Sequence, residues 1–151
     1  MNTVNFGAKF IQNKFIYKKD PSGKYLPEKV SIVELDTKNL EDIAFLKVLS
    51  QDLGNFSYAE SLFSDIVMNL QVHLKKINQK ILILTSQKEN FSKMDTNSEK
   101  GFISYYVYPN NEIRVNYLEG LQNNFFNNKK RDYKHIGKAL FNSMIEQDSP
   151  K

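Results

Sequence analysis

The sequence contains no cysteine and only two histidines, His73 and His135, among its 151 residues. The absence of thiols excludes disulfide bonds, cysteine nucleophiles and thiolate metal sites. Two imidazole side chains are too few for the histidine-rich centres of many metalloenzymes. We therefore expect no metal site in this chain.

Long apolar segments are missing as well. No stretch approaches the roughly 18 consecutive apolar residues that indicate a membrane helix, and Met1 to Phe6 lack the basic-then-apolar pattern of a secretory signal. Both absences favour a cytoplasmic protein that does not bind a membrane. A length of 151 residues, 40% of them hydrophobic, predicts a single domain over residues 1–151.

Arginine is scarce in an otherwise basic chain. The 21 Lys and Arg residues exceed the 17 Asp and Glu residues, which gives a formal charge of +4, but arginine occurs only at Arg114 and Arg131. The excess positive charge favours anionic ligands. Sequence-specific DNA readers usually rely on the planar guanidinium group, so we consider nucleic acid an unlikely partner.

Residues 8–35 predict a β-hairpin that leads into the first strand of a sheet. Apolar, β-prone residues such as Phe15 and Ile16 precede the turn sequence Asp20-Pro21-Ser22-Gly23. Proline presets one dihedral angle of such a turn, and glycine supplies a positive φ. The returning segment contains the apolar residues from Val30 to Leu35.

Two helices are expected within residues 36–79. Asp36-Thr37 followed by the acids Glu41 and Asp42 is typical of a helix start, and Leu53-Gly54 is typical of its end. The second helix should begin at Asn55 or Ser57 and run to about Ile77, because apolar residues recur there near every fourth position.

Central strands are expected within residues 80–120. Lys80 to Thr85 reads as a strand buried on both faces, and Phe102 to Tyr108 with Ile113 to Leu118 predicts a second hairpin. A polar, basic loop from Leu121 to Asp132 leads to a final helix over residues 133–147. The pattern predicts an α/β fold of the α+β kind, in which helices pack on a mixed, mainly antiparallel sheet.

The segment from Lys134 to Leu140 is the most informative for function. It places Gly137 at a loop-to-helix junction between basic residues. The first N–H groups of a helix have no partner within the helix, and the helix dipole adds positive charge there, so an anion can bind. The alternative interpretation is an ordinary amphipathic helix whose basic first turn is solvated.

This segment resembles the pyrophosphate-binding motif of the GNAT superfamily of acyl-CoA-dependent N-acyltransferases, written Q/R-x-x-G-x-G/A and often continuing as G-I-G-K-A-L. Lys134 to Ala139 reads K-x-x-G-x-A; aligned on the longer form, His135 replaces the first glycine and Ile136 to Leu140 agree. The expected element order, a strand, two helices, a buried strand, a hairpin and the motif helix, is similar to the first two-thirds of that fold. The hairpin in residues 8–35 would be an addition before its first strand.

The resemblance implies an acyl-CoA-dependent N-acyltransferase, or a truncated relative of one that lacks the C-terminal part of the fold. Such an enzyme transfers an acetyl group from acetyl-CoA to a primary amine on a small molecule or a protein. The pantetheine arm would pair with the strand before the motif helix, here at Val115, Tyr117 and Leu118. Glu119 would be the general base that accepts a proton from the amine; the alternative for Glu119 is a solvated acid at a strand end. The helix start would bind the pyrophosphate through Lys134, His135, Ile136, Gly137, Lys138 and Ala139.

Two departures from the family pattern lead to a different hypothesis. The segment from Leu121 to Asp132 is longer than the family's loop and lacks its proline, and the family's further strands after the motif helix have no counterpart before Lys151. The strand before the motif helix would then be an open edge, through which we expect a homodimer. The alternative function is a non-catalytic interaction module that binds a protein or nucleic-acid partner through this edge and the basic loop.

Overall fold

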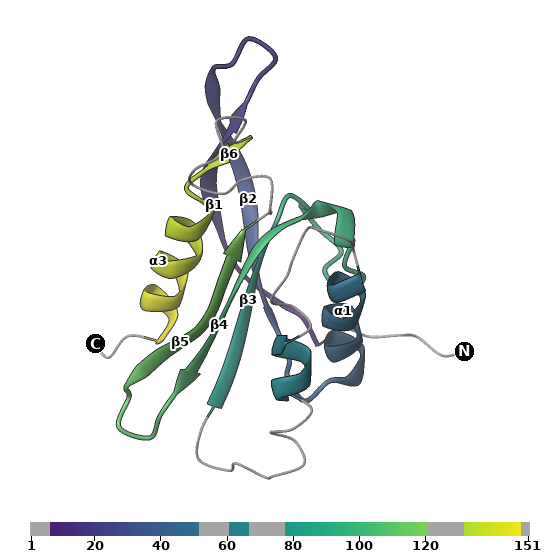
Figure 1. Ribbon diagram of the computed structural model, residues 1–151, viewed down its shortest axis with the longest axis vertical. Helices are drawn as coiled ribbons and strands as arrows, with labels where there is room; N and C mark the ends of the chain where they lie inside the picture. The colour runs from purple at the N-terminus through teal and green to yellow at the C-terminus, as the bar shows by residue number, and fades with distance from the viewer. Residues whose placement is uncertain (1–6, 52–60, 67–77, 121–131, 149–151) are drawn as a thin grey trace.

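The computed structural model describes residues 7–51, 61–66, 78–120 and 132–148, which form an α+β fold around one six-stranded sheet (Figure 1). The strand order is β5-β4-β3-β2-β1-β6. The elements are β1 (Lys9–Lys19), β2 (Tyr25–Leu35), α1 (Leu40–Gln51), β3 (Asn78–Thr85), the 3-10 helix η1 (Thr96–Ser98), β4 (Glu99–Val107), β5 (Ile113–Gly120), β6 (Tyr133–Lys134) and α3 (Ile136–Asp148).

Every pair of neighbouring strands in the described residues is antiparallel, so the expected mixed sheet is wrong in this respect. The reason lies in the connections. Each strand from β2 to β5 lies beside the strand that precedes it in the chain, and the chain reverses its direction at every step, across α1 between β2 and β3 and across a tight turn between β4 and β5. No crossover among the described strands returns a strand parallel to its neighbour.

Strands β1 and β2 form a long antiparallel pair that extends beyond the rest of the sheet in Figure 1. The turn between them is held by the carboxylate of Asp20, which accepts hydrogen bonds from the backbone N–H groups of Ser22 and Lys24 and from the Ser22 hydroxyl. Gly23 has a φ of 87°, the left-handed conformation that glycine adopts without strain. The turn residues therefore act as their sequence predicts.

Helix α1 and the helical residues 61–66 cover one face of the sheet, which we call the α1 face. The start of α1 is capped by the Asn39 side chain, which accepts a hydrogen bond from the backbone N–H of Glu41 at 2.9 Å. Buried Asp42 accepts hydrogen bonds from the N–H groups of Gly7 and Asp36, and burial raises the pKa of its carboxyl group. The remainder of the expected second helix lies outside the described residues.

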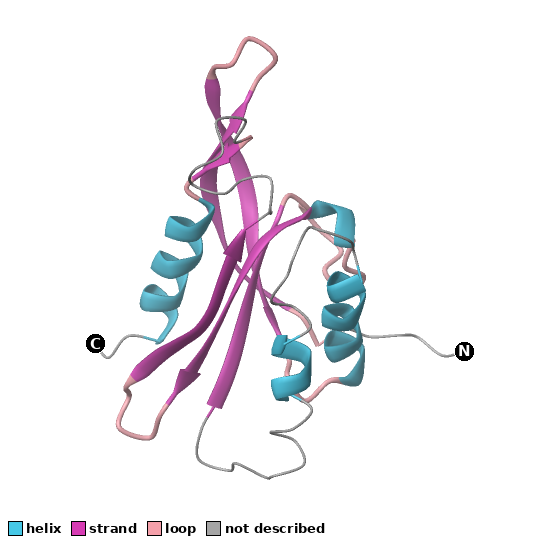
Figure 2. Ribbon diagram, in the orientation of Figure 1, coloured by secondary structure: helices cyan, strands magenta, loops and turns pink. Residues whose placement is uncertain are grey.

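Helix α3 covers the opposite face, which we call the α3 face (Figure 2). Each strand alternates its side chains between the two faces, so each face has its own apolar cluster. The α1-face cluster includes Val33, Ile83, Leu46, Leu62 and Phe102. The α3-face cluster includes Ile32, Leu82, Tyr105, Ile136 and Leu140.

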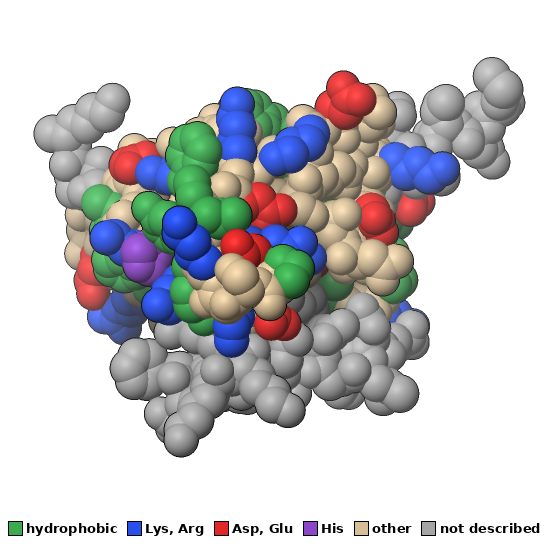
Figure 3. Space-filling model, turned by 90° about the horizontal axis from the view of Figure 1, so that it is seen from above, with side chains coloured by type: hydrophobic (Ala, Val, Ile, Leu, Met, Phe, Trp, Pro, Cys, Tyr) green, Lys and Arg blue, Asp and Glu red, His purple; other side chains and the backbone are tan. Residues whose placement is uncertain are grey.

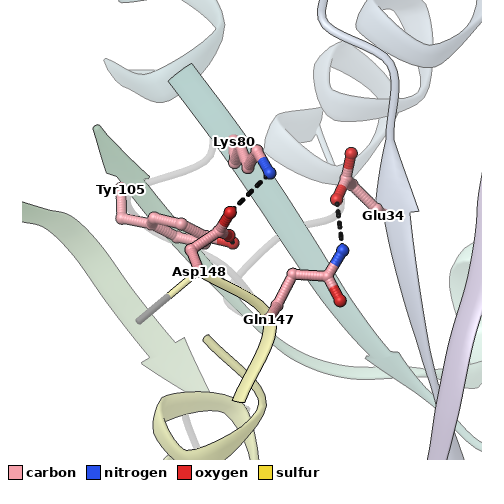
Figure 4. A network of polar contacts seen from close by, with 5 residues as sticks. All are labelled: Glu34, Lys80, Tyr105, Gln147 and Asp148. Carbon is pink, nitrogen blue, oxygen red and sulfur yellow. Dashed lines mark hydrogen bonds and ion pairs between the residues drawn. The ribbon is translucent and has the colours of Figure 1, made fainter. Parts of the chain in front are cut away.

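The last residue of α3 is anchored to the sheet by a partly buried polar network (Figure 4). The carboxylate of Asp148 lies 2.6 Å from the ammonium group of Lys80 on β3 and accepts a hydrogen bond from the hydroxyl of Tyr105 on β4. An acid at a helix C-terminus opposes the helix dipole. The two partners on the sheet explain why an acid stands there, and they hold the helix in place along the strands.

None of the described helices is long and apolar enough to cross a membrane.

Candidate functional site

The start of α3 lies directly over the end of β5, because two glycines make room for it. Gly101 on β4 and Gly120 on β5 face each other across the strand pair, and the side chain of Ile136 packs over both. A Cβ atom at position 101 would lie only 2.7 Å from Cγ2 of Ile136 and 2.8 Å from the backbone oxygen of Glu119. A side chain at position 101 would therefore displace the helix start from the strand end.

The helix begins at Ile136, three residues later than the sequence predicts. Tyr133 and Lys134 instead form β6, which pairs with Lys18 and Tyr17 of β1. His135 then turns the chain with a φ of 75°, and its carbonyl accepts the hydrogen bond from Ala139 N–H that opens the helix. Lys134 and His135 thus precede the helix, and Ile136, Gly137, Lys138 and Ala139 make up its first turn.

Basic and aromatic side chains lie beside the start of α3, and Figure 3 shows a histidine with Lys, Arg and hydrophobic side chains around it on this surface. The ammonium group of Lys134 lies 4.0 Å from the ring centre of Tyr25, and that of Lys100 lies 5.3 Å from the ring centre of Tyr133. Such contacts hold a cation at a ring face without neutralising its charge. Lys138 is exposed on the first turn. These cations lie at the positive end of the helix dipole, and the carboxylates of Glu28 and Asp132, which act on the Tyr133 hydroxyl, oppose them.

His135 lies on the same surface as these lysines. Its ring makes an edge contact with the ring of Tyr17, with 5.1 Å between the ring centres. The left-handed backbone of His135 is a conformation that glycine adopts at lower cost than other residues. The position therefore has the backbone of a glycine site, although the sequence places a histidine there.

Strand β5 is an edge strand in the described sheet and carries a bulge in its middle. The register with β4 shifts so that Tyr105 opposes Val115 and Ser104 opposes Tyr117, which leaves Asn116 as the extra residue. Val115 and Leu118 lie on the α3 face and are exposed. No strand in the described residues pairs with the outer edge of the predicted pantetheine segment.

The side chains of Tyr117 and Glu119 lie on the opposite, α1 face of β5. The Tyr117 hydroxyl donates a hydrogen bond to the carboxylate of Asp65 at 3.2 Å. Glu119 opposes Phe102 and is only 4% exposed, so the interpretation of Glu119 as a solvated acid is wrong. The predicted base is buried beside the strand edge, whereas the predicted phosphate-binding residues lie across the sheet at the start of α3.

A buried acid that the sequence analysis missed is Glu99, the first residue of β4. It is 2% exposed, and neither carboxylate oxygen has a hydrogen-bond partner among the residues that the structure describes. It lies beside Thr85, which in turn pairs with Ser31, so these polar residues form a row across three strands of the α1 face. Burial raises the pKa of Glu99 well above its usual value, against the opposing effect of the charge on Lys100.

The position of Glu99 could not be recognised from the sequence because it follows a polar segment and precedes a lysine, as solvated acids do. Only the apolar run from Phe102 onward signals the strand.

The basic loop residues Lys129, Lys130 and Arg131 lie outside the described part of the chain. Within the described part, no group of three or more His, Asp or Glu side chains is arranged to hold a metal ion.

Comparisons with models of known protein families, with curated proteins and with solved structures found no match to this chain.

Proposed function

We propose that the protein is an acyl-CoA-dependent N-acyltransferase of the GNAT kind, acting in the cytoplasm, which transfers an acetyl group from acetyl-CoA to a primary amine. The observation that carries this proposal is the arrangement at the end of β5. The strand end, an accessible backbone edge and the positive start of α3 lie together there.

The order of the elements supports the proposal. From β2 onward the chain forms a strand, a helical segment, a buried strand, a hairpin and a final helix, and the strands lie in the order β2-β3-β4-β5. The helices of the first segment and of the last lie on opposite faces of the sheet. This is the order that the resemblance to the superfamily implies for the first two-thirds of its fold.

The start of α3 supplies the groups that a pyrophosphate needs. The first N–H groups of the helix have no acceptors within the helix, and they stand beside exposed Lys134 and Lys138. Gly137, the second helical residue, has no side chain that would keep a phosphate from the backbone. Hydrogen bonds from these groups to charged phosphate oxygens are stronger than hydrogen bonds between neutral groups.

Strand β5 supplies the second half of the site. Its outer edge offers backbone groups from Val115 to Leu118 to the amide groups of a pantetheine arm, as a further strand would use them. Glu119 lies one residue beyond on the α1 face. There it accepts the proton that the amine must lose, because only a neutral amine attacks a thioester. The carbon–nitrogen bond then forms as the carbon–sulfur bond breaks, and the thiolate takes up a proton.

Two substitutions of Gly137 test the proposal. A Cβ atom at this position meets only Cδ2 of Leu118, at an ordinary contact distance of 3.9 Å, so Gly137→Ala and Gly137→Asp should both fold. An acid in the first turn even favours the helix. We expect Gly137→Asp to weaken coenzyme A binding at least ~10-fold by charge repulsion, as measured by titration calorimetry.

Gly137→Ala is the matched control, because it adds the same Cβ atom without the charge. It should bind coenzyme A within about threefold of the wild-type affinity, which is less than 1 kcal/mol. Equal binding by the Asp variant and the wild type would show that the helix start does not hold the pyrophosphate, and the proposed function would be wrong.

A further inference from the structure

A carboxylate that the proposed reaction does not use lies beside β5 on the α1 face. It belongs to Asp65, in the helical residues 61–66, and accepts a hydrogen bond from the Tyr117 hydroxyl at 3.2 Å. Burial and this hydrogen bond raise the pKa of the Tyr117 hydroxyl, so the tyrosine remains the donor and the carboxylate the acceptor. Asp65 forms no ion pair with any residue that the structure describes.

The cation that β5 itself contributes to this face is already paired. Arg114 lies opposite Tyr106 of β4, and its guanidinium group is 2.9 Å from the carboxylate of Glu112. The same guanidinium lies over the ring of Tyr108, 5.1 Å from its centre. Because Arg114 and Glu112 balance each other, the negative charge of Asp65 is left for a ligand.

Three further side chains of β4 and β5 share this face with Asp65. Tyr106 follows Ser104 by two residues on β4, so the two side chains point the same way, and Tyr117 lies directly opposite Ser104. The ring faces of tyrosines attract cations, and an ammonium group also donates hydrogen bonds to oxygen atoms. We call Asp65, Tyr106, Tyr117 and Ser104 the cation site.

Ser104 is a buried polar residue at the base of this site. It is 0% exposed, and its hydroxyl oxygen has no hydrogen-bond partner among the residues that the structure describes. Its neighbours across the strands are Ile81, which is apolar, and Tyr117, whose hydroxyl is directed to Asp65. A buried hydroxyl without a partner is costly. An ammonium group bound beside Tyr117 would give this hydroxyl a hydrogen bond.

The cation site is next to the proposed base along the strand. Tyr117 and Glu119 are two residues apart on β5 and point to the same face, so their Cα atoms are separated by about 6.8 Å. Phe102, which lies opposite Glu119, belongs to the apolar cluster on which the Tyr117 ring packs. A ligand that reaches from Glu119 to Asp65 therefore passes along apolar side chains, which suit a methylene chain with an amine at each end.

We propose that the acceptor is an aliphatic diamine, of which one amine is acetylated beside Glu119 while the other stays protonated and is bound by Asp65 and the tyrosine rings. The inference rests on the proposed function, because it names the substrate class of that reaction. The reacting ammonium loses one proton to Glu119, which passes it to water, and a second to the thiolate as the carbon–nitrogen bond replaces the carbon–sulfur bond. The products are a mono-acetylated diamine with one positive charge and free coenzyme A.

Two acceptors of equal length test the proposal. Diaminopentane and aminopentane present the same primary amine, but only the diamine carries a second ammonium group. Release of thiol from acetyl-CoA measures the rate, and the chain adds no background because it contains no cysteine. We expect kcat/KM for diaminopentane to exceed that for aminopentane at least ~10-fold, mainly through KM, because the second amine takes no part in the chemistry.

Asp65→Asn separates the charge of this residue from its structural role. The amide oxygen still accepts a hydrogen bond from Tyr117, whereas the negative charge is lost. We expect the preference for the diamine to fall at least ~10-fold in this variant. Glu146→Gln is the matched control, because it removes an acid that is paired with Lys14 on the α3 face, and it should keep the wild-type preference.

Binding without acetyl-CoA distinguishes this inference from the proposed function. Titration calorimetry should show tighter binding of diaminopentane than of aminopentane to the wild type, and no such difference for Asp65→Asn. Equal affinity for the two amines, or a preference that survives Asp65→Asn, would overturn the inference even where acetyl transfer occurs. An Asp65-dependent preference in a chain that acetylates neither amine would instead contradict the proposed function and leave the cation site standing.

Discussion

Glu99 shows what a single buried carboxyl group does to the stability of this molecule. It is buried at the start of β4 beside Thr85 of β3, and burial raises the pKa of its carboxyl group, so the folded state favours the protonated form. In the unfolded chain a glutamate titrates at about pH 4.3. Above that pH the Glu99 side chain is ionised in the unfolded chain but still protonated in the folded protein. The free energy of unfolding therefore falls as the pH rises toward the pKa of the buried Glu99.

We therefore expect Glu99→Gln to remove this pH dependence. The variant should match the wild type near pH 4 and be more stable than it near pH 8, because the neutral amide never has to be buried as a charge. Urea unfolding at several pH values measures the difference.

Glu146 is the control of opposite sign. A hydrogen bond from Lys14 lowers the pKa of the Glu146 carboxyl group. The small contribution of this ion pair to the stability of the folded state is therefore present above about pH 4.3 and is lost as the pH falls. Glu146→Gln should lose a little stability at neutral pH and none at low pH. A Glu99→Gln variant that loses stability at neutral pH would contradict the account of Glu99.

The sequence predicts the conformation and contacts of a residue well where these depend only on its neighbours in the chain. Asp20 and Gly23 form their turn as expected, because a carboxylate and a flexible backbone act within a few residues. The environment of Glu119 and Glu99 depends on strands that pair from distant parts of the chain. Burial of these acids could not be read from their neighbours in sequence.

At the scale of elements, the contact between α3 and the strands depends on one small residue. Gly101 leaves the space in which Ile136 approaches β4 and β5, and the backbone oxygen of Glu119 closes that space on the other side. A backbone atom cannot rotate away as a flexible side chain can. The cost of any side chain at position 101 is therefore a shift of the helix start.

Gly101→Ala should destabilise the fold by about 1–3 kcal/mol, the usual cost of overpacking, and should displace the start of α3. Gly120→Ala is the matched control from the opposite strand. Its Cβ atom would lie 3.6 Å from Ile136 and 3.8 Å from the nearest backbone oxygen, which are ordinary contacts. Thermal unfolding of both variants measures the difference, and equal destabilisation would show that Gly101 has no special role.

Helix α3 also shows which element boundaries a pattern can predict. The apolar spacing of Ile136, Leu140 and Met144 is local and indicates the helix correctly. The pairing of Tyr133 with Lys18 is a tertiary contact, so nothing in the pattern excludes Tyr133 and Lys134 from the helix. The contacts of Asp148 with Lys80 and Tyr105 are the kind that its position indicates. An acid at a helix C-terminus is unfavourable with the helix dipole, so it is favoured there when a cation or a hydroxyl group contacts it.

At the scale of the whole molecule, the two faces of the sheet have different roles in our account. The α1 face buries Glu119 and Glu99, and the end of the α3 face presents basic groups around the helix start. The outer edge of β5 lies between them. The order of the elements was predictable because the spacing of apolar residues within each segment indicates a helix or a strand. The purely antiparallel pairing and the bulge at Asn116 depend on contacts between strands, which this spacing does not show.

Titration of the isotope-labelled wild-type chain with acetyl-CoA, followed by the NMR shifts of its backbone amides, tests whether the helix start and the strand edge bind one ligand. We expect saturable changes in two groups of amides together, Ile136 to Ala139 at the start of α3 and Val115 to Leu118 on β5. A folded chain whose amides in both groups stay unchanged at millimolar acetyl-CoA would contradict this expectation.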